Sequence, residues 1–392
     1  MINRVLMPRE LLIGGGSRFQ LPGIVKSLGV RRPLLVCDPV MRKLGHADAL
    51  LQALADEDVD AAIFSDVVED PTDITIQSLV DRISDGSHDG LVALGGGSAI
   101  DTAKAGAIVA TSGDELRALK VPRIVDFTVM PVVAIPTTAG TGSEVTRAAV
   151  VTDTSASEKM LILGTAALPV AAIIDYELTL TCPYRVTVDT GIDALTHALE
   201  ALVNRNGNTH AEALALSALK LIGVHLERVA NDPNDRTSRE AMMLGATHAG
   251  LAVSNTSTAL IHGLSRPIGA FFHVPHGMSN AMVLPLVTQF SLNAALPRYA
   301  AAARALGCAT SDDSDPVAGA KLVEAFIGLN KRLKVPTPEE FGIERSRYLG
   351  LLPEMVRQGL ASGTPGNNPR IPNEAEMTRL YELAYDGQLE AV

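Results

Sequence analysis

The sequence predicts a two-domain protein: an α/β domain with a Rossmann-like parallel sheet, followed by an all-α domain. In the first half of the chain, short apolar runs alternate with segments of helical periodicity. After about residue 182 only helical periodicity remains. The length of 392 residues also exceeds what one typical hydrophobic core supports. We therefore expect a cofactor-binding domain over 1–182 and a helical metal- and substrate-binding domain over 183–392.

The first domain is expected to contain five strands, because five apolar runs are each followed by a turn or a helical pattern. The final strand is followed by TCPYR, which we interpret as a hinge. The expected strands are 33–38, 61–67, the run that begins at 90, 131–137 and 171–175, and the helical patterns between them include 41–56 and 72–86. In the second domain helices are expected over 188–203, 209–230, 238–254 and 302–307.

The composition excludes several classes of protein. Apolar residues make up 47% and charged residues 20%, which is typical of a globular chain. A net charge of −11 without a Lys/Arg run argues against binding to nucleic acid or to anionic membranes. We see neither a signal peptide nor an apolar run of membrane-spanning length, and the three cysteines are widely spaced. The expected location is therefore cytoplasmic.

A glycine-rich loop, LGGGSAID, joins a predicted strand to a predicted helix. Gly95, Gly96 and Gly97 would let backbone N–H groups approach a phosphate, and the start of the helix would add partial positive charge. Ser98 suits the N-cap, and Asp101 follows three residues later, as in a capping box. A tight, well-capped turn without a ligand explains the same pattern equally well.

A second loop, PTTAGTGSEVT at 136–146, also follows an apolar strand. Two such loops at the carboxyl ends of parallel strands predict a cleft for a phosphorylated ligand. Asp38 ends an earlier strand and could bind both ribose hydroxyls of an adenosine while repelling a 2′-phosphate. A solvated acid at a strand end is the alternative. IGGGS at 13–17 echoes the first loop but is followed by no helix-forming segment, so we infer no repeat.

Four residues of the second half could bind a divalent metal. Asp193 and His197 are four apart on a predicted helix, so both side chains lie on one face. This spacing is also common by chance. His262 and His276 are expected at two helix ends that face each other, the first helix stopping at Pro267. One carboxylate and three imidazoles would leave room for a substrate oxygen.

Two further residues are placed near the substrate. His273 lies in an extended or irregular segment between the histidines and could carry protons. Arg266 lies one helical turn after His262, and a guanidinium binds a carboxylate well. Pairing with a nearby acid, or capping of the helix end, are the alternatives for Arg266.

Together these motifs resemble the iron-containing, or group III, alcohol dehydrogenase family. The relatives of this family include glycerol dehydrogenase, maleylacetate reductase and dehydroquinate synthase. The resemblance covers nearly the whole chain, and many motifs in one order are specific. They are CDP (37–39), DPT (70–72), GGGSAIDTAK (95–104), PTTAGTGSEVT (136–146), DTGIDALTHALE (189–200), HGLSRPIGAFFHVPHGMSNAMVLP (262–285) and GNNPR (366–370).

The resemblance implies a dehydroquinate-synthase-like two-domain fold, NAD(P), a metal, and a homodimer or larger assembly. The implied metal is Fe²⁺, although the ligand types also accept Zn²⁺. By motif match the implied metal ligands are Asp193, His197, His262 and His276. The implied pyrophosphate site is Gly96, Gly97 and Ser98, and the implied dinucleotide site includes Thr137, Thr138 and Thr141. The resemblance also implies that Lys159 reaches the nicotinamide ribose and that Asp38 gives a preference for NAD.

The sequence departs from the family pattern at two positions. Asp70 stands where asparagine is usual, which would change a cofactor contact. Arg266 stands where many alcohol-specific members carry a second histidine. This difference bears on the nature of the substrate.

The leading hypothesis is a metal-dependent oxidoreductase that transfers a hydride between a primary or secondary alcohol and NAD(H). The alternative is a dehydrogenase or maleylacetate-reductase-like enzyme that acts on a carboxylate-bearing substrate through Arg266. A lyase of the dehydroquinate-synthase type and a non-catalytic cofactor or metal sensor are the rivals. The partner is in each case a small molecule rather than nucleic acid or a membrane.

Overall fold

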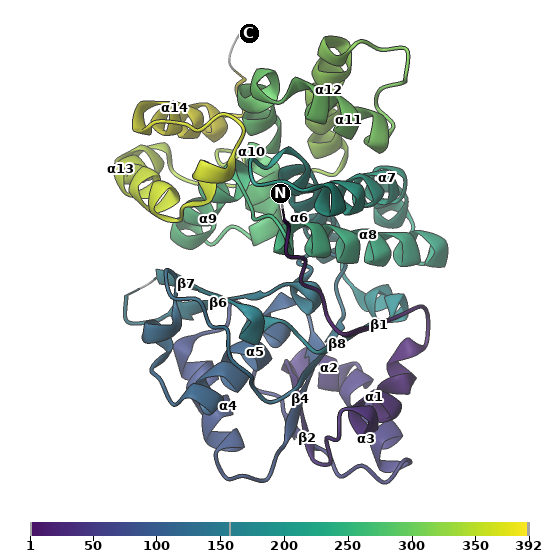
Figure 1. The fold of residues 1–392 in the computed structure, drawn as a ribbon. Helices are drawn as coiled ribbons and strands as arrows, with labels where there is room; N and C mark the ends of the chain where they lie inside the picture. The colour runs from purple at the N-terminus through teal and green to yellow at the C-terminus, as the bar shows by residue number, and fades with distance from the viewer. Residues whose placement is uncertain (1, 157, 390–392) are drawn as a thin grey trace. The chain divides into compact units, whose positions relative to one another are not determined.

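The computed structural model describes residues 2–156 and 158–389 (Figure 1). The chain divides into two compact units, one spanning Arg4–Cys182 and the other containing the chain from Pro183 onward. We describe each unit by itself, as the α/β unit and the helical unit. Among the described residues, no helix combines the length and the apolar character needed to cross a membrane.

The α/β unit is built on a six-stranded sheet whose strands all pair in parallel. The strand order is β1-β8-β5-β4-β2-β3, which places the first and the last of these strands side by side at one edge. The predicted fold class is therefore confirmed. The strands are β1 (Glu10–Ile13), β2 (Pro33–Cys37), β3 (Ala62–Phe64), β4 (Gly90–Gly95), β5 (Val132–Pro136) and β8 (Ala171–Ile174).

Strand residues alternate between two hydrophobic cores, one on each face of this sheet. In β2, Leu35 belongs to one core while its neighbours Leu34 and Val36 belong to the other. The side-chain period of two explains the alternation, and burial on both faces explains why the strands are continuously apolar. Helices α1 (Leu21–Ser27) and α3 (His46–Ala55) cover the first core, and α4 (Asp73–Ile83) and α5 (Gly97–Ser112) cover the second (Figure 1).

Three strands were not predicted. β1 is a short, half-exposed edge strand, and β6 (Ala148–Asp153) pairs antiparallel with β7 (Glu158–Leu163) in a separate two-stranded sheet. The helix predicted over 41–56 is instead two helices, α2 (Pro39–Lys43) and α3. The break lies at Gly45, whose φ of 77° is left-handed and ends helical continuation.

The helical unit surrounds α6 (Tyr184–Val203), which is buried along nearly its whole length from Thr187 onward. Side-chain caps begin the next two helices: Asn208 accepts from the N–H of Ala211, and Asp235 accepts from the N–H of Ser238. The helices that follow α6 are α7 (Thr209–Asn231), α8 (Arg236–Ser254), α9 (Leu260–Phe272), α10 (His276–Ser291), α11 (Leu296–Leu306), α12 (Asp315–Arg332), α13 (Arg345–Ala361) and α14 (Glu374–Tyr385).

The predicted helix end at Pro267 is wrong, because α9 continues through this proline to Phe272. A proline inside a helix removes one hydrogen bond, here to the carbonyl of Gly263. That carbonyl faces Gly359 of α13, where an added Cβ would lie 2.8 Å from its oxygen. Gly359 therefore lets α13 pack closely on α9 where the proline removes this helical hydrogen bond. The chain turns instead at His273, whose φ of 55° is left-handed.

Candidate metal centre and cofactor loops

Three helices of the helical unit bring metal-binding side chains to one point. Asp193 comes from α6, His262 from α9 and His276 from the first residue of α10, and their ligand atoms lie within 4.8 Å of one another. Asp193 Oδ1 lies 3.5 Å from His262 Nε2 and 3.6 Å from His276 Nε2. These distances exceed good hydrogen bonds, but they fit the edges of about 3.4 Å between tetrahedral ligands on a divalent ion. The donor set and its spacing therefore fit a metal.

His197, the fourth predicted ligand, follows Asp193 by one turn of α6. Its Nε2 lies 3.7 Å from Asp193 Oδ1, and its ring stacks on the ring of His262 with centroids 4.8 Å apart. Its Nδ1 is buried without a hydrogen-bond partner among the described residues. His197 therefore lies beside Asp193 and His262, whereas the ligand atoms that all lie within 4.8 Å of one another are those of Asp193, His262 and His276.

Burial and mutual contact set the charges of these groups. Burial alone would raise the pKa of Asp193, but the surrounding imidazoles outweigh it and hold this pKa below its ordinary value. Burial lowers the pKa of His197, and lowers the pKa of His276 to about 3 although 42% of that side chain is exposed. For His262 burial lowers the pKa, but the carboxylates of Glu200 and Asp193 outweigh burial and raise this pKa. A divalent ion binds the neutral form of an imidazole.

Glu200 contacts the ring nitrogen of His262 that does not face Asp193, and its role was not predicted from the sequence. His262 Nδ1 donates to Glu200 Oε2 at 2.6 Å, and the other carboxylate oxygen accepts from the N–H groups of Ile261 and His262 at 2.7 and 3.2 Å. This bond leaves His262 Nε2 as the lone-pair nitrogen that faces Asp193. The available signal was the position of Glu200 on α6, one turn after His197.

Asn280 supports the carboxylate side of the centre and was also overlooked. Its Nδ2 donates to Asp193 Oδ1 at 2.8 Å and lies 3.3 Å from His262 Nε2. Its Oδ1 accepts a hydrogen bond from the Ser265 hydroxyl, which fixes the orientation of the amide. The signal in the sequence was its spacing of four residues from His276 on α10.

Gly277 explains how α10 reaches the centre. A Cβ at this position would lie 1.9 Å from the carbonyl oxygen of Asp189 on α6. The first turn of α10 therefore lies directly against the backbone of α6, and only glycine permits this approach. The close packing sets the position of the neighbouring His276.

The two predicted cofactor loops lie against each other in the α/β unit. A Cβ on Gly97 would lie 3.0 Å from Thr141 Cγ2, and one on Gly96 would lie 3.4 Å from Thr138 Oγ1. Thr137 is buried, and its N–H donates to the carbonyl of Gly95 at 3.0 Å. These contacts place the loops side by side at the carboxyl ends of β4 and β5, where α/β sheets bind ligands.

Asp38 also reaches this edge of the sheet. Its Oδ1 caps α2 by accepting from the N–H groups of Val40 and Met41 at 2.7 and 3.1 Å. Its Oδ2 lies 3.5 Å from where a Cβ of Gly95 would be. The carboxylate thus has one oxygen committed to the helix and the other turned toward the glycine loop.

The capping box predicted for Ser98 and Asp101 is wrong. Helix α5 begins at Gly97, its N-cap is Gly96, and no side chain caps it. The Asp101 carboxylate instead accepts from the Ser143 hydroxyl and from the N–H of Val150, which draw it away from the helix start. No described side chain therefore caps the start of α5, which is where a helix binds an anion.

A buried lysine that the sequence analysis overlooked supports these loops. Lys104 is fully buried, and its Nζ donates to Ser143 Oγ at 2.8 Å and to the carbonyls of Thr146 and Ala148 at 3.1 and 2.9 Å. Burial lowers the pKa of Lys104 to about 8, although the nearby Asp101 opposes this effect. The signal in the sequence was a single lysine within an apolar helix. Lys104 ties α5 to the end of the second loop.

The remaining predicted residues are more exposed. Lys159 lies on β7, and its Nζ pairs with Asp70 Oδ1 at 2.8 Å; Asp70 has a left-handed φ of 52°. His273 is exposed at the end of α9. Arg266 lies on α9 and is partly buried.

The glycine loop that echoes the cofactor loop is filled by the protein itself. Asp175 accepts from the N–H groups of Gly16 and Arg18 at 3.1 and 3.2 Å, and from the Arg18 guanidinium at 2.6 Å. A buried carboxylate therefore satisfies the loop N–H groups that an anion would use. The two similar sequences therefore differ in what surrounds their backbone N–H groups.

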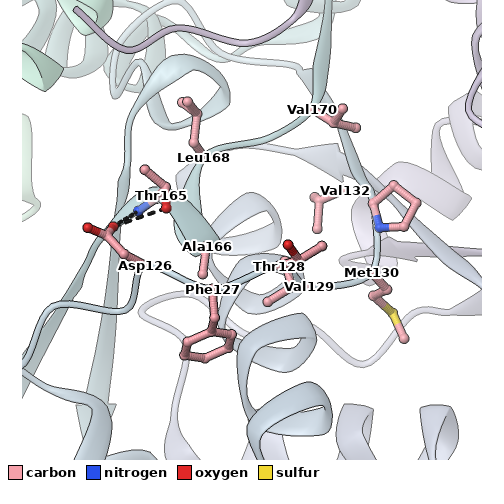
Figure 2. A pocket seen from close by; sticks show the side chains of 11 residues that line it. Asp126, Phe127, Thr128, Val129, Met130, Val132, Thr165, Ala166, Leu168 and Val170 are labelled. Atoms are coloured by element: carbon pink, nitrogen blue, oxygen red, sulfur yellow. Dashed lines mark hydrogen bonds between the residues drawn. The ribbon is translucent and has the colours of Figure 1, made fainter. Parts of the chain in front are cut away.

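A separate pocket of about 350 Å³ lies elsewhere in the α/β unit (Figure 2). It is lined by residues 126–132 and by Thr165, Ala166, Leu168 and Val170, and Asp126 accepts hydrogen bonds from the N–H and hydroxyl of Thr165. Val132 and Val170 stand at the amino ends of β5 and β8. Because the glycine loop follows a carboxyl end, this pocket is not part of the cofactor loops.

Comparison with known proteins agrees with this geometry. Residues 8–176 match the family described as iron-containing alcohol dehydrogenase, and residues 187–385 match the C-terminal part of the Fe-containing alcohol dehydrogenase family. The NAD-dependent methanol dehydrogenase of Bacillus methanolicus is 32% identical, covering 96% of this chain and 98% of that protein. The NADPH-dependent butanol dehydrogenase of Clostridium saccharobutylicum is 31% identical, covering 98% of each. The crystal structure of a 1,3-propanediol oxidoreductase superposes with a TM-score of 0.94 at 30% identity, covering 98% of this chain and 100% of that chain.

Proposed function

Because this chain belongs to the iron-containing alcohol dehydrogenase family, we propose that Asp193, His197, His262 and His276 bind the divalent metal of an NAD-dependent alcohol dehydrogenase. The resemblance predicted from the motifs is confirmed, and the chain is an oxidoreductase that transfers a hydride between an alcohol and NAD(H). The observation that supports the assignment of ligands is the convergence of Asp193, His262 and His276 at metal-ligand spacing, with His197 Nε2 3.7 Å from Asp193 Oδ1.

The residues of the helical unit have distinct parts in this function. A divalent ion bound to these ligands would act as a Lewis acid on the alcohol oxygen and lower the pKa of the alcohol. Glu200 keeps His262 in the tautomer that can bind a metal, and Asn280 orients the Asp193 carboxylate. The exposed edge of His276 leaves one side of the centre open to a substrate. We propose Fe²⁺ as the natural metal, while the same ligand types also bind Zn²⁺.

The cofactor part of the proposal rests on the α/β unit. Gly95, Gly96, Gly97 and Ser98 would bind the pyrophosphate through backbone N–H groups at the uncapped start of α5. Thr137, Thr138 and Thr141 belong to the second loop, which would form the other side of this site. Asp101 supports the second loop by accepting a hydrogen bond from Ser143. The nicotinamide of the bound cofactor would accept the hydride.

Two charged residues bear on cofactor choice. Asp38 turns one oxygen toward the glycine loop, where it would bind the ribose hydroxyls of NAD and repel the phosphate of NADP. Lys159 would reach the nicotinamide ribose once released from Asp70. Because one relative is named for NADPH, we expect this preference to depend on Asp38 rather than on the family.

Proton release is assigned to His273. Its imidazole is exposed on the short turn between α9 and α10, three residues before His276. It would pass the alcohol proton to solvent, so no covalent intermediate is needed. A cytoplasmic homodimer or larger homo-oligomer completes the proposal. The described residues contain no disulfide, which suits a reducing compartment.

The decisive experiment is removal and replacement of the metal. Chelation should lower kcat for 1-butanol oxidation at least about 100-fold, because Lewis-acid assistance supplies several kcal/mol, and Fe²⁺ should restore it better than Zn²⁺, Mn²⁺ or Co²⁺. NADH binding, followed by fluorescence, should be retained because the cofactor loops share no residue with the metal ligands. Full turnover by metal-free protein would contradict the proposal, and NADH that fails to accumulate would favour a lyase.

A further inference from the structure

Arg266 is a cation without a counter-ion beside the metal centre. It follows His262 by one turn of α9, so the two side chains share one face of the helix. Within the described part of the chain its guanidinium makes no ion pair, and Nη2 donates only a long hydrogen bond of 3.4 Å to Thr258 Oγ1. A guanidinium carries five N–H donors, so most of its binding capacity is unused by the protein.

The nearby carboxylates are committed to other groups. Glu200 accepts from the ring and the backbone of His262, and Asp193 accepts from Asn280 and faces the imidazoles. Burial lowers the pKa of Arg266 below its ordinary value, and these two carboxylates offset that effect only in part. Arg266 is therefore a poorly solvated charge that its surroundings do not neutralise.

The charges of the proposed centre show what would neutralise it. Asp193 and Glu200 together carry two negative charges, which balance a divalent ion. Arg266 then leaves the centre with one positive charge in excess. A substrate that carries one negative charge of its own would remove this excess.

We propose that Arg266 binds an anionic group of the substrate, so that the enzyme prefers hydroxy acids and their oxo-acid counterparts over neutral alcohols. This inference rests on the proposed function, which places the reacting hydroxyl at the metal ligands. A carboxylate matches the planar fork of a guanidinium with two parallel hydrogen bonds. One helical turn, about 5.4 Å, separates Arg266 from His262 along α9, so hydroxyl and carboxylate belong at opposite ends of a short carbon chain.

The test compares matched substrates that differ only in their far end. We would measure kcat and KM for 1-butanol and for 4-hydroxybutyrate, with shorter and longer members of both series, in the wild type, Arg266→Gln and Arg266→Lys. Arg357→Gln is the control, because Arg357 lies exposed on α13 and pairs only with Glu354 among the described residues. Metal content is measured in every variant.

We expect Arg266→Gln to raise KM for 4-hydroxybutyrate at least about 10-fold, the size of one lost charged hydrogen bond, with 1-butanol changed less than about threefold. Arg266→Lys should recover part of the loss, and Arg357→Gln should match the wild type. Equal losses in kcat/KM on both substrates would overturn the proposal, because they would assign Arg266 to the chemistry. A wild type that prefers 1-butanol at every chain length would also overturn it.

A binding measurement separates this inference from the proposed function. Butyrate, which has no hydroxyl to oxidise, is titrated calorimetrically into the metal-loaded wild type and Arg266→Gln proteins. We expect its Kd to rise at least about 10-fold in the variant. An unchanged Kd, or no butyrate binding by the wild type, would overturn the role of Arg266. Binding that depends on Arg266 without turnover of any alcohol would contradict only the proposed function.

Discussion

The cofactor loops and the metal centre are built from different parts of the polypeptide. The loops of the α/β unit present backbone N–H groups and small side chains, whereas the centre in the helical unit presents one carboxylate and three imidazoles. The loops are supported by the buried Lys104, which donates to Ser143. The centre is supported by Glu200, which accepts from His262, and by Asn280, which donates to Asp193. A site made of backbone N–H groups thus depends on the residues that hold its loops in place. A site made of side chains depends on the residues that orient each metal ligand.

This difference predicts that disruption of the support affects each unit in its own way. Breaking the support of the loops should mainly cost stability and cofactor affinity. Breaking the support of the centre should mainly cost metal affinity.

Lys104→Met should lower the free energy of unfolding by about 3 to 5 kcal/mol, because it removes a fully buried cation and leaves the partly buried Asp101 carboxylate without its partner. The KM for NAD should rise because the end of the second loop loses its anchor, while metal affinity should not change. Urea denaturation, cofactor kinetics and calorimetric metal titration measure these three quantities. Lys120→Met is the control, because Lys120 pairs at the surface with Glu158 and should cost less than about 1 kcal/mol. A stable Lys104→Met protein with an unchanged KM would contradict the anchoring role.

Glu200→Gln should act on the metal centre alone. The amide oxygen can still accept from His262 Nδ1, but the charge that makes His262 a stronger ligand is lost. We expect metal affinity to fall by about 10- to 100-fold, measured with a competing chelator. NADH affinity should be unchanged. A loss of NADH binding, or metal affinity equal to that of the wild type, would contradict the separation of the two sites.

The sequence was informative wherever function follows from local spacing. The parallel sheet could be predicted because buried strands alternate regularly with helices. Local spacing predicts that Asp193 and His197 share a helix face, which the structure shows, and that His262 and His276 flank a turn. The grouping of all four residues as metal ligands was implied by the family resemblance and stays a prediction. The strand and helix-face patterns depend on neighbours within a few residues along the chain.

The rest depends on partners that are distant in the sequence. Glu200 and Asn280 look like ordinary polar residues until α9 and α6 bring His262 and Asp193 to them. Pro267 suggests a helix end, but α9 continues past it where α13 packs closely. The β6–β7 sheet was missed because its sequences, AAVVTD and EKMLIL, do not alternate between apolar and polar residues, although burial alternates along β6. Tertiary contacts of this kind leave no periodic signal.

The smallest expected effect concerns the packing of α10 on α6. Gly277→Ala would place a Cβ 1.9 Å from the carbonyl oxygen of Asp189, so the first turn of α10 must shift and carry His276 with it. We expect a loss of about 1 to 3 kcal/mol in stability, measured by urea denaturation, together with weaker metal binding. Gly350→Ala on α13 is the matched control, because nothing lies within 4 Å of its added Cβ. This control should keep metal affinity and gain about 0.4 to 1 kcal/mol from the reduced freedom of the unfolded chain. Equal behaviour of the two variants would show that the contact with Asp189 does not position His276.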